Sequence, residues 1–164
     1  MNGLSGARRL ARPVRLALAP ALGTELDGAW WPHTASVASE LPELVGILHQ
    51  QLGVVVDISI NWSATEGPLD LNTITASGKS LGGAQNRRPR LMVVAGRDVH
   101  ATLLVLPHLT SQGLGTIVMR KAVDAPVERS QRDAKLHETA ECVLRAAHTE
   151  SARWSESRRE TVSG

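Results

Sequence analysis

The segment Leu26-Asp27-Gly28-Ala29-Trp30-Trp31-Pro32 constrains the fold more than any other part of this chain. It holds two of the four Trp residues of a protein that has no Phe and no Tyr. The core must therefore be aliphatic, with Trp as its large anchors. Asp27 and Gly28 are typical of a turn, and Pro32 favours an extended exit. Because adjacent residues of an extended segment point to opposite sides, we expect at most one of the two Trp side chains in the core.

The same motif is a candidate ligand site as well as a candidate corner of the core. An exposed Trp can form an aromatic wall, with other polar and aromatic side chains around it. The candidate ligand-binding residues are Asp27, Trp30, Trp31, Asn61 and Trp62. In the structural alternative, Asp27 accepts backbone hydrogen bonds and the Trp pair joins the first strand to the following helix. The sequence favours the structural role but leaves the ligand site open.

Composition limits the class of protein. The 164 residues are enough for one domain with appendages, and the hydrophobic share of 42% and charged share of 21% predict a folded middle. The single Cys142 excludes an internal disulfide and indicates a reducing, cytoplasmic location. No apolar run approaches the ~20 residues of a membrane span. A net charge of +2 excludes strong polyanion binding driven by global charge.

The pattern along the chain predicts four parts. Residues 1–12 are basic, small and polar, and are expected to be disordered. Residues 13–123 form the core domain, residues 124–152 a hinge with a C-terminal helix, and residues 153–164 a flexible tail.

The elements of the core predict an α+β fold. Strands are expected at 14–19, 54–61, 69–75, 90–94 and 99–106, with the last two joined as a hairpin. They form a mainly antiparallel sheet of about five strands, covered on one face by a helix at 39–52, alone or with a short helix at 110–123.

The ends of the predicted helices carry recognisable caps. Ser39 is a plausible N-cap for the first helix and places Pro42 in its first turn. The alternative begins this helix at Thr34 or Ser36 and kinks it at Pro42. Gly53 stands where a C-terminal cap belongs. Either Thr110 or Ser111 is expected to be the N-cap of the short helix, and the sequence does not distinguish between them.

The C-terminal helix, from about Glu128 to Ala152, has a narrow apolar stripe. The stripe consists of Leu136, Ala140, Val143, Leu144 and Ala147. Such a helix must pack on something to be stable, and the hinge at 124–126 allows a choice of surface. We expect self-association, or binding of a protein partner, through residues 128–152; packing on its own domain is the alternative.

No motif for catalysis or metal binding is complete. Ser77-Gly78-Lys79-Ser80 resembles the end of a phosphate-binding loop, but Thr73 stands where that loop needs a Gly. His137 and Glu141 lie one helical turn apart, yet no second cluster supplies the remaining ligands of a metal site. We therefore predict no metal site, no cofactor and no catalytic residue. The sequence favours a non-enzymatic protein. A Ser-His-Asp site assembled from distant positions stays open.

A basic loop gives a third hypothesis. No acid occurs between Leu71 and Arg97, whereas Arg87, Arg88 and Arg90 gather there. These three residues are candidates for weak, salt-sensitive nucleic-acid binding, and a solvated loop is the alternative.

Five segments together resemble a family of small uncharacterised actinobacterial proteins, particularly mycobacterial ones. They are Leu16–Pro20, Leu26–Pro32, Glu40–Leu44, Ile58–Trp62 and Leu103–Pro107, within about residues 14–123. His33 departs from the basic residue that many relatives carry. The resemblance implies an actinobacterial source and a compact intracellular domain, without an established activity. The leading functional hypothesis is thus a non-enzymatic interaction or regulatory module.

Overall fold

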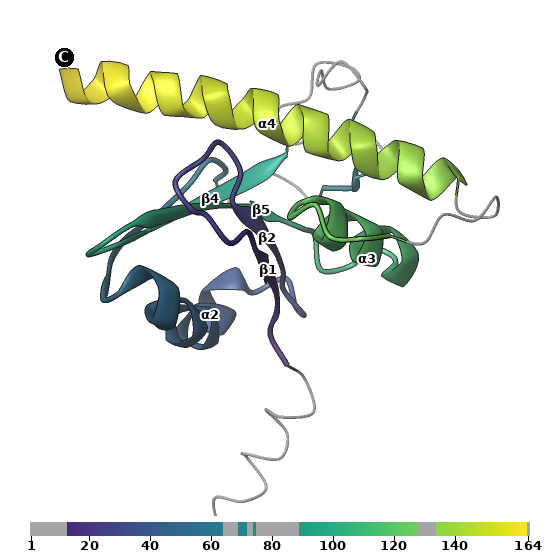
Figure 1. Cartoon of the computed structure of the whole chain (residues 1–164), viewed down its shortest axis with the longest axis horizontal. Helices are drawn as coiled ribbons and strands as arrows, with labels where there is room; N and C mark the ends of the chain where they lie inside the picture. Colours follow the sequence, from purple (N-terminus) through teal and green to yellow (C-terminus); the bar gives the residue numbers. More distant parts are fainter. Residues whose placement is uncertain (1–12, 64–68, 72–73, 75–88, 128–133, 164) are drawn as a thin grey trace, which may run out of the picture.

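A computed structural model describes residues 13–63, 69–71, 74, 89–127 and 134–163. Across these residues a five-stranded sheet has the order β1-β2-β5-β4-β3 (Figure 1). The strands are β1 (Arg15–Leu18), β2 (Gly28–Trp31), β3 (Val55–Ile60), β4 (Arg90–Gly96) and β5 (His100–Val105), and the helices are α2 (Val37–Leu52), α3 (Gln112–Lys121) and α4 (Ala134–Ser163). All neighbouring strands are antiparallel except β2 and β5, which are parallel. The predicted α+β fold is confirmed.

The Trp motif forms β2, an inner strand of the sheet that the sequence analysis did not predict. Trp31 pairs with Arg15 of β1, and Gly28 pairs with Leu103 of β5. The strand predicted at 69–75 was wrong in its described part, where the residues form a short turn and one isolated bridge. Leu69, Leu71 and Ile74 are nevertheless buried, because they pack over the sheet instead of extending it.

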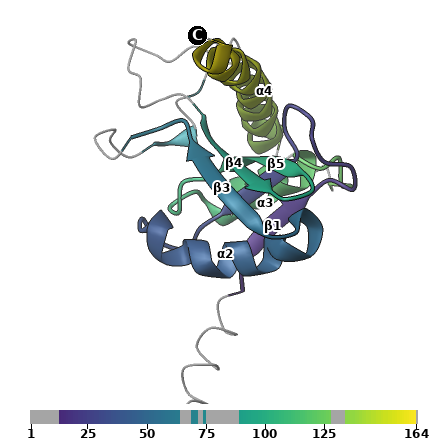
Figure 2. The same cartoon turned by 90° about the vertical axis from the view of Figure 1, so that its left-hand side faces the viewer.

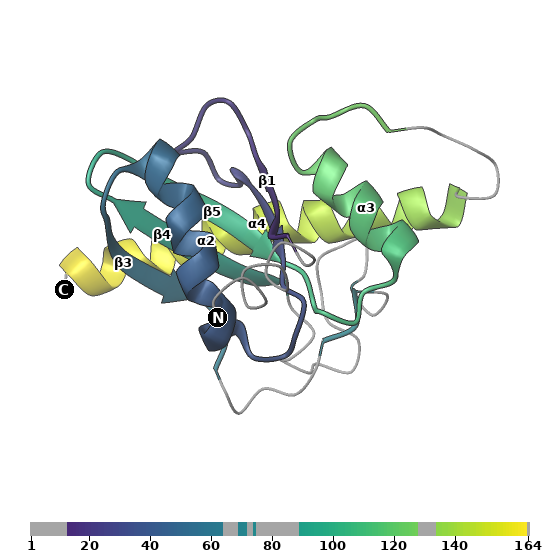
Figure 3. The same ribbon diagram turned by 90° about the horizontal axis from the view of Figure 1, so that it is seen from below.

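Helices cover both faces of the sheet (Figures 1 and 2). The α2 core, on one face, contains Trp30, Leu44, Leu48, Leu52, Met92, Val94, Ala101, Leu103 and Val105. The α3–α4 core, on the other, includes Trp31, Leu91, Leu104, Leu106, Leu114, Val118, Ala140, Val143 and Ala147. Seen from below, α2 crosses the sheet on the near side and α4 lies behind it (Figure 3). The expectation that 110–123 would cover the same face as α2 was wrong.

Two covered faces also explain why both Trp side chains are buried. Trp30 is 1% exposed and Trp31 is 4% exposed, so the expectation of at most one core Trp was wrong. Successive side chains of β2 point to opposite faces of the sheet, as expected. Because both faces are covered, Trp30 enters the α2 core and Trp31 enters the α3–α4 core.

Helix α2 begins earlier than at Ser39. Its N-cap is Ser36, which confirms the earlier start given as the alternative, and Pro42 lies inside the helix. The carboxylate of Glu40 accepts hydrogen bonds from the backbone N of His33 and Thr34, at 2.8 and 2.7 Å, and from Thr34 Oγ1 at 2.7 Å. These bonds hold the entry to the helix. Gly53 is the C-cap, as predicted, with a φ of 72°.

Helix α4 packs on its own domain. Ala140, Val143 and Ala147 of its apolar stripe are fully buried in the α3–α4 core. The helix continues to Ser163, so the predicted end at Ala152 was too early. Arg153 pairs with Glu150 at 3.2 Å, and Trp154 packs against the core, which extends the helix past the predicted stop. The predicted disordered segment 1–12 and residues 128–133 lie outside the described residues.

No helix in the part of the chain that the structure describes combines the length and apolar character needed to cross a membrane.

Candidate ligand-binding site

Asp27, the polar residue of the Trp motif, is a structural latch. Its side chain is completely buried. One carboxylate oxygen accepts hydrogen bonds from Thr24 N at 2.9 Å and Thr24 Oγ1 at 2.8 Å, and the other accepts one from Thr102 N at 2.8 Å. The carboxylate therefore ties the loop before β2 to strand β5, and its acceptors are occupied by the protein itself.

The two Trp side chains of the motif are buried, and the Trp31 ring has close neighbours on two sides. The Arg15 guanidinium lies 3.7 Å from the centroid of the Trp31 ring. It also donates hydrogen bonds to Trp31 O at 3.1 Å and Pro32 O at 2.9 Å. On the other side, Gly115 of α3 lies so close to the Trp31 ring that there is no room for a Cβ. Neither Trp30 nor Trp31 is placed to form the wall of an open site.

Asn61 is a structural residue too. Its Nδ2 donates to Pro89 O and to Glu150 Oε2, both at 3.0 Å, and its Oδ1 accepts from Leu91 N at 2.7 Å. These bonds fasten the end of β3 to the start of β4 and to α4. Four of the five residues expected to bind a ligand are thus committed to the fold.

Trp62, the fifth candidate, lies at a cavity. This cavity, which we call the strand-end cavity, has a volume of about 480 Å³. Its described lining comes from the segments that follow β2, β3 and β5, from the first residue of β4 and from the start of α2. The lining residues are Pro32, Thr34, Ala35, Val37, Trp62, Ser63, Leu69, Arg90, Val105, Leu106, Pro107, His108 and Leu109.

The topology explains why these residues meet. Parallel strands β2 and β5 end at the same edge of the sheet, and β3 ends and β4 begins there because the antiparallel pairs reverse direction. Arg90 pairs in register with Val105, the last residue of β5. Its guanidinium lies 5.7 Å from the centroid of the Trp62 ring. Of the basic candidates, Arg90 is therefore at the cavity, while Arg87 and Arg88 lie outside the described residues.

The walls of the cavity are mainly apolar. Leu69, Val105 and Leu106 are buried, whereas Trp62 and His108 are half-buried and reachable from solvent. At the rim, Leu109 is 82% exposed, an unusual position for a large apolar side chain beside a cavity. The polar groups are few, which is the composition of sites that orient a small molecule.

Glu40 is outside the described lining of the cavity but accepts hydrogen bonds from Thr34, which is part of it. Burial raises the pKa of Glu40. Hydrogen bonds from the His33 backbone, the Thr34 hydroxyl and the Thr34 backbone, together with the charge of His33, lower this pKa by more than burial raises it. The pKa of Glu40 consequently lies below its ordinary value, and the carboxylate is ionised at neutral pH.

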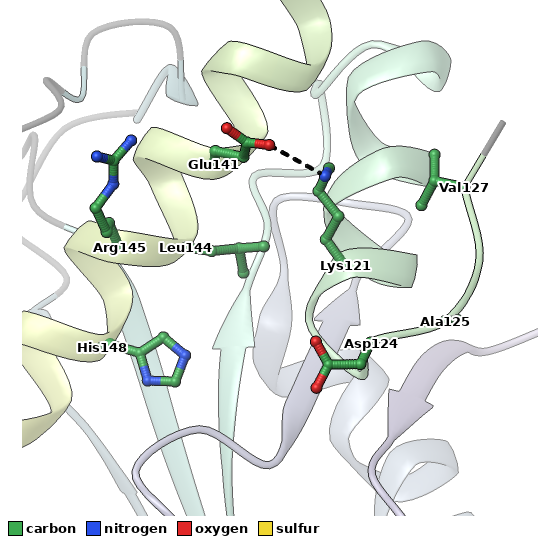
Figure 4. Close-up of a pocket in the computed structure, with 8 residues that line it drawn as sticks. All are labelled: Lys121, Asp124, Ala125, Val127, Glu141, Leu144, Arg145 and His148. Carbon is green, nitrogen blue, oxygen red and sulfur yellow. Dashed lines mark hydrogen bonds and ion pairs between the residues drawn. The ribbon is translucent and has the colours of Figure 1, made fainter. Parts of the chain in front are cut away.

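A second hollow, of about 630 Å³, lies between the end of α3 and the middle of α4 (Figure 4). Its Lys121 Nζ lies 3.4 Å from Glu141 Oε1. Asp124, Arg145 and His148 complete a ring of charges of both signs, and all three are exposed. The charged side chains here are mostly exposed and the described lining has few buried apolar walls, so this hollow is a poorer candidate than the strand-end cavity.

The pair His137 and Glu141, considered above as metal ligands, is divided in the structure. His137 is 5% exposed, whereas Glu141 is exposed and pairs with Lys121. Within the described ranges, no three His, Cys, Asp or Glu side chains form a group suited to a metal ion.

Among the described lining residues, the sequence had named Trp62 as a candidate for ligand binding and Arg90 as a candidate for nucleic-acid binding, and it had named none of the others as a site residue. The available signal was a pair of prolines: Pro32 ends β2 and Pro107 follows β5. The residues that follow β2 and β5 lie close together because these two strands are parallel neighbours. The parallel pairing of β2 with β5 was not predicted.

Comparison with known proteins gives a family and no activity. A family of unknown function, DUF5994, matches residues 15–122, which span the whole sheet, α2 and α3. The match covers nearly the same residues as the resemblance noted from the sequence. No curated protein and no solved structure matches the chain. The chain belongs to the DUF5994 family of unknown function, and the matched region contains the described lining of the strand-end cavity.

Proposed function

We propose that this chain is a small-ligand-binding domain whose ligand occupies the strand-end cavity. The observation that carries the proposal is a cavity of about 480 Å³ with buried apolar walls and a reachable Trp62. Its volume falls in the range of about 300–1,000 Å³ that is common for small-molecule sites. Its place beyond the carboxyl ends of two parallel strands is also a frequent one for ligands.

Binding without catalysis fits the polar groups of the cavity better than an enzymatic role. No carboxylate is present among the described lining residues, so His108 has no acidic side chain there to orient it as a base. A ligand-binding domain of this kind agrees with the regulatory role inferred from the sequence. The cytoplasmic location and actinobacterial source are retained as part of this proposal.

An interaction role through α4 has less support. The apolar stripe that was expected to contact a partner is occupied by the protein's own core. Self-association through residues 128–152 stays a prediction and would have to use the exposed faces of the helix. Nucleic-acid binding by Arg87, Arg88 and Arg90 likewise stays a prediction, to be tested by its salt dependence.

Fluorescence titration with N-phenyl-1-naphthylamine tests the ligand-binding proposal. This dye is neutral and apolar, and its emission rises in an apolar cavity. We expect saturable binding at one site per chain. Ala35→Phe, which adds a ring to an exposed residue of the lining, should weaken binding about tenfold or more, and Trp62→Ala should weaken it as well.

Ala152→Phe is the matched control. Ala152 is an exposed residue of α4, outside the described lining of the cavity, so the same added ring should leave the affinity unchanged. Absence of saturable binding, or equal losses in Ala35→Phe and Ala152→Phe, would reject the cavity as the ligand site.

A further inference from the structure

Several polar side chains of the strand-end cavity are already engaged within the protein. Thr34 donates to one carboxylate oxygen of Glu40 twice, from its backbone N and from Oγ1, each at 2.7 Å. The Arg90 guanidinium lies 5.7 Å from the centroid of the Trp62 ring. Arg90 has another interaction partner in the chain, and Ser63 has one as well. A ligand that required these groups would have to displace contacts that the protein makes with itself.

The charges around the cavity favour an ion of neither sign. No carboxylate is present among the described lining residues, so a cationic ligand would find no counter-charge in them. An anionic ligand would meet an arginine that is already engaged. It would also approach the ionised carboxylate of Glu40, which is hydrogen-bonded to Thr34 of the lining. An ion that leaves water without gaining a partner pays a large desolvation cost, so the cavity disfavours charged ligands.

The apolar surface of the cavity is where a ligand gains most. Leu69, Val105 and Leu106 form buried walls, and Leu109 at the rim is 82% exposed. Covering such surface with an apolar molecule removes it from water, and the stabilisation grows with the apolar area that is covered. The body of the ligand is therefore expected to be apolar.

His108 is the hydrogen-bonding side chain that this cavity offers to a ligand. It lines the cavity and is half-buried. In the part of the chain that the structure describes, its imidazole makes no hydrogen bond or ion pair. An imidazole presents an N–H donor in either protonation state, and its neutral form also has an acceptor nitrogen. It can therefore bind a hydroxyl, a carbonyl or an amide, none of which carries a charge.

We infer that the ligand of the strand-end cavity is an uncharged, largely apolar molecule with one polar group, which hydrogen-bonds to His108. Its apolar body packs against Trp62 and the aliphatic walls. The inference rests on the proposed function, because it names the class of ligand for the same site.

Four naphthalene compounds of similar size test the class of ligand by displacing N-phenyl-1-naphthylamine from the intact protein. 1-Naphthalenemethanol is neutral and carries a hydroxyl, and 1-methylnaphthalene is neutral without one. At pH 7, 1-naphthoate is an anion and 1-naphthylmethylamine is a cation. The alcohol should displace the dye at a concentration about tenfold lower than either ion, because only the ions lose the hydration of a charge.

His108→Leu tests the hydrogen bond. This variant removes the ring nitrogens, so it should weaken binding of the alcohol about fivefold relative to binding of 1-methylnaphthalene, as the loss of one hydrogen bond does. His108→Gln retains a donor and an acceptor and should keep most of the difference. His148→Leu is the matched control, because His148 is exposed on α4 and lines the other hollow. Far-ultraviolet circular dichroism reports the folding of each variant.

The comparison of the alcohol with the two ions needs no variant, so it decides the class of ligand even if His108→Leu does not fold. Displacement by either ion at the same concentration as the alcohol would overturn the inference and leave the ligand site standing. Equal effects of His108→Leu on the two neutral compounds, or a loss in His148→Leu instead, would overturn the hydrogen bond to His108. Failure of N-phenyl-1-naphthylamine itself to bind would overturn the proposed function together with the inference.

Discussion

Replacement of Gly115 by Ala should destabilise the protein, although Ala is the better helix former. A Cβ at Gly115 would meet Cη2 and Cζ3 of the Trp31 ring and come within 2.8 Å of Cζ2. A retreat of the ring would displace the guanidinium of Arg15, a residue of β1, which lies 3.7 Å from the ring centroid. Overpacking of a rigid core costs about 3 kcal/mol at the upper end of its usual range. The higher helix propensity of Ala relative to Gly offsets about 1 kcal/mol of this cost.

The expected net loss is therefore about 2 kcal/mol, which corresponds to roughly 4–8 °C in the melting temperature of a chain of this size. Urea unfolding followed by far-ultraviolet circular dichroism measures it without relying on Trp emission. Gly46→Ala in α2 is the matched control. A Cβ at Gly46 meets nothing within 4 Å, so this variant should gain about 1 kcal/mol from helix propensity alone.

A double variant identifies the cause. In a Trp31→Leu background the ring is absent, so the loss caused by Gly115→Ala should disappear. The packing argument is refuted if Gly115→Ala is as stable as Gly46→Ala, or if its loss is unchanged in the Trp31→Leu background.

Four further predictions concern stability. Trp30→Ala should cost about 3–5 kcal/mol in a urea melt, as for other large core truncations, and a loss below 1 kcal/mol would contradict its place in the α2 core. Asp27→Ala leaves the N–H of Thr102 without its acceptor and should cost about 3 kcal/mol; a melt unchanged from the intact chain would exclude the latch. Because the pKa of Glu40 is lowered on folding, its stabilisation is present above the unfolded value and is lost as pH falls through the folded one. Glu40→Gln should therefore differ most from the intact protein at neutral pH, and a difference that grows in acid would reverse the sign. A version ending at Val123 lacks α4 and should lose its cooperative melt, whereas an unchanged melting temperature would mean that α4 adds no stability.

The hairpin of β4 and β5 and the C-cap of α2 were accessible from the sequence because their signals are local. Gly53 stands directly after the last apolar residue of α2, and Pro107 follows the end of β5. Strand β2 had no such signal. Its four residues, Gly28 to Trp31, contain no period, and the residues of β5 with which they pair begin at Leu103. Nothing in a short window indicates a pairing across that distance.

The error at 69–75 has the opposite cause. Alternating Leu69 and Leu71 imitate a strand, yet the alternation arises because one side of a turn faces the core. The same limit applies to the candidate site. Trp62 and Arg90 were visible as residue types, but the cavity between Pro32 and Leu109 exists only once four strand ends have been brought to one edge.

The parallel pairing of β2 with β5 also sets an order of events during synthesis. Residues 13–63 leave the ribosome first and already contain β1, β2, α2 and β3. Strand β2 then has β1 as a neighbour on one side only, and β3 has no partner until β4 is made. Until residues 90–105 emerge, Trp30 and Trp31 have neither completed core to enter. Nearly sixty residues separate Trp31 from Arg90, so both indoles are synthesised long before the strands β4 and β5 against which their cores form.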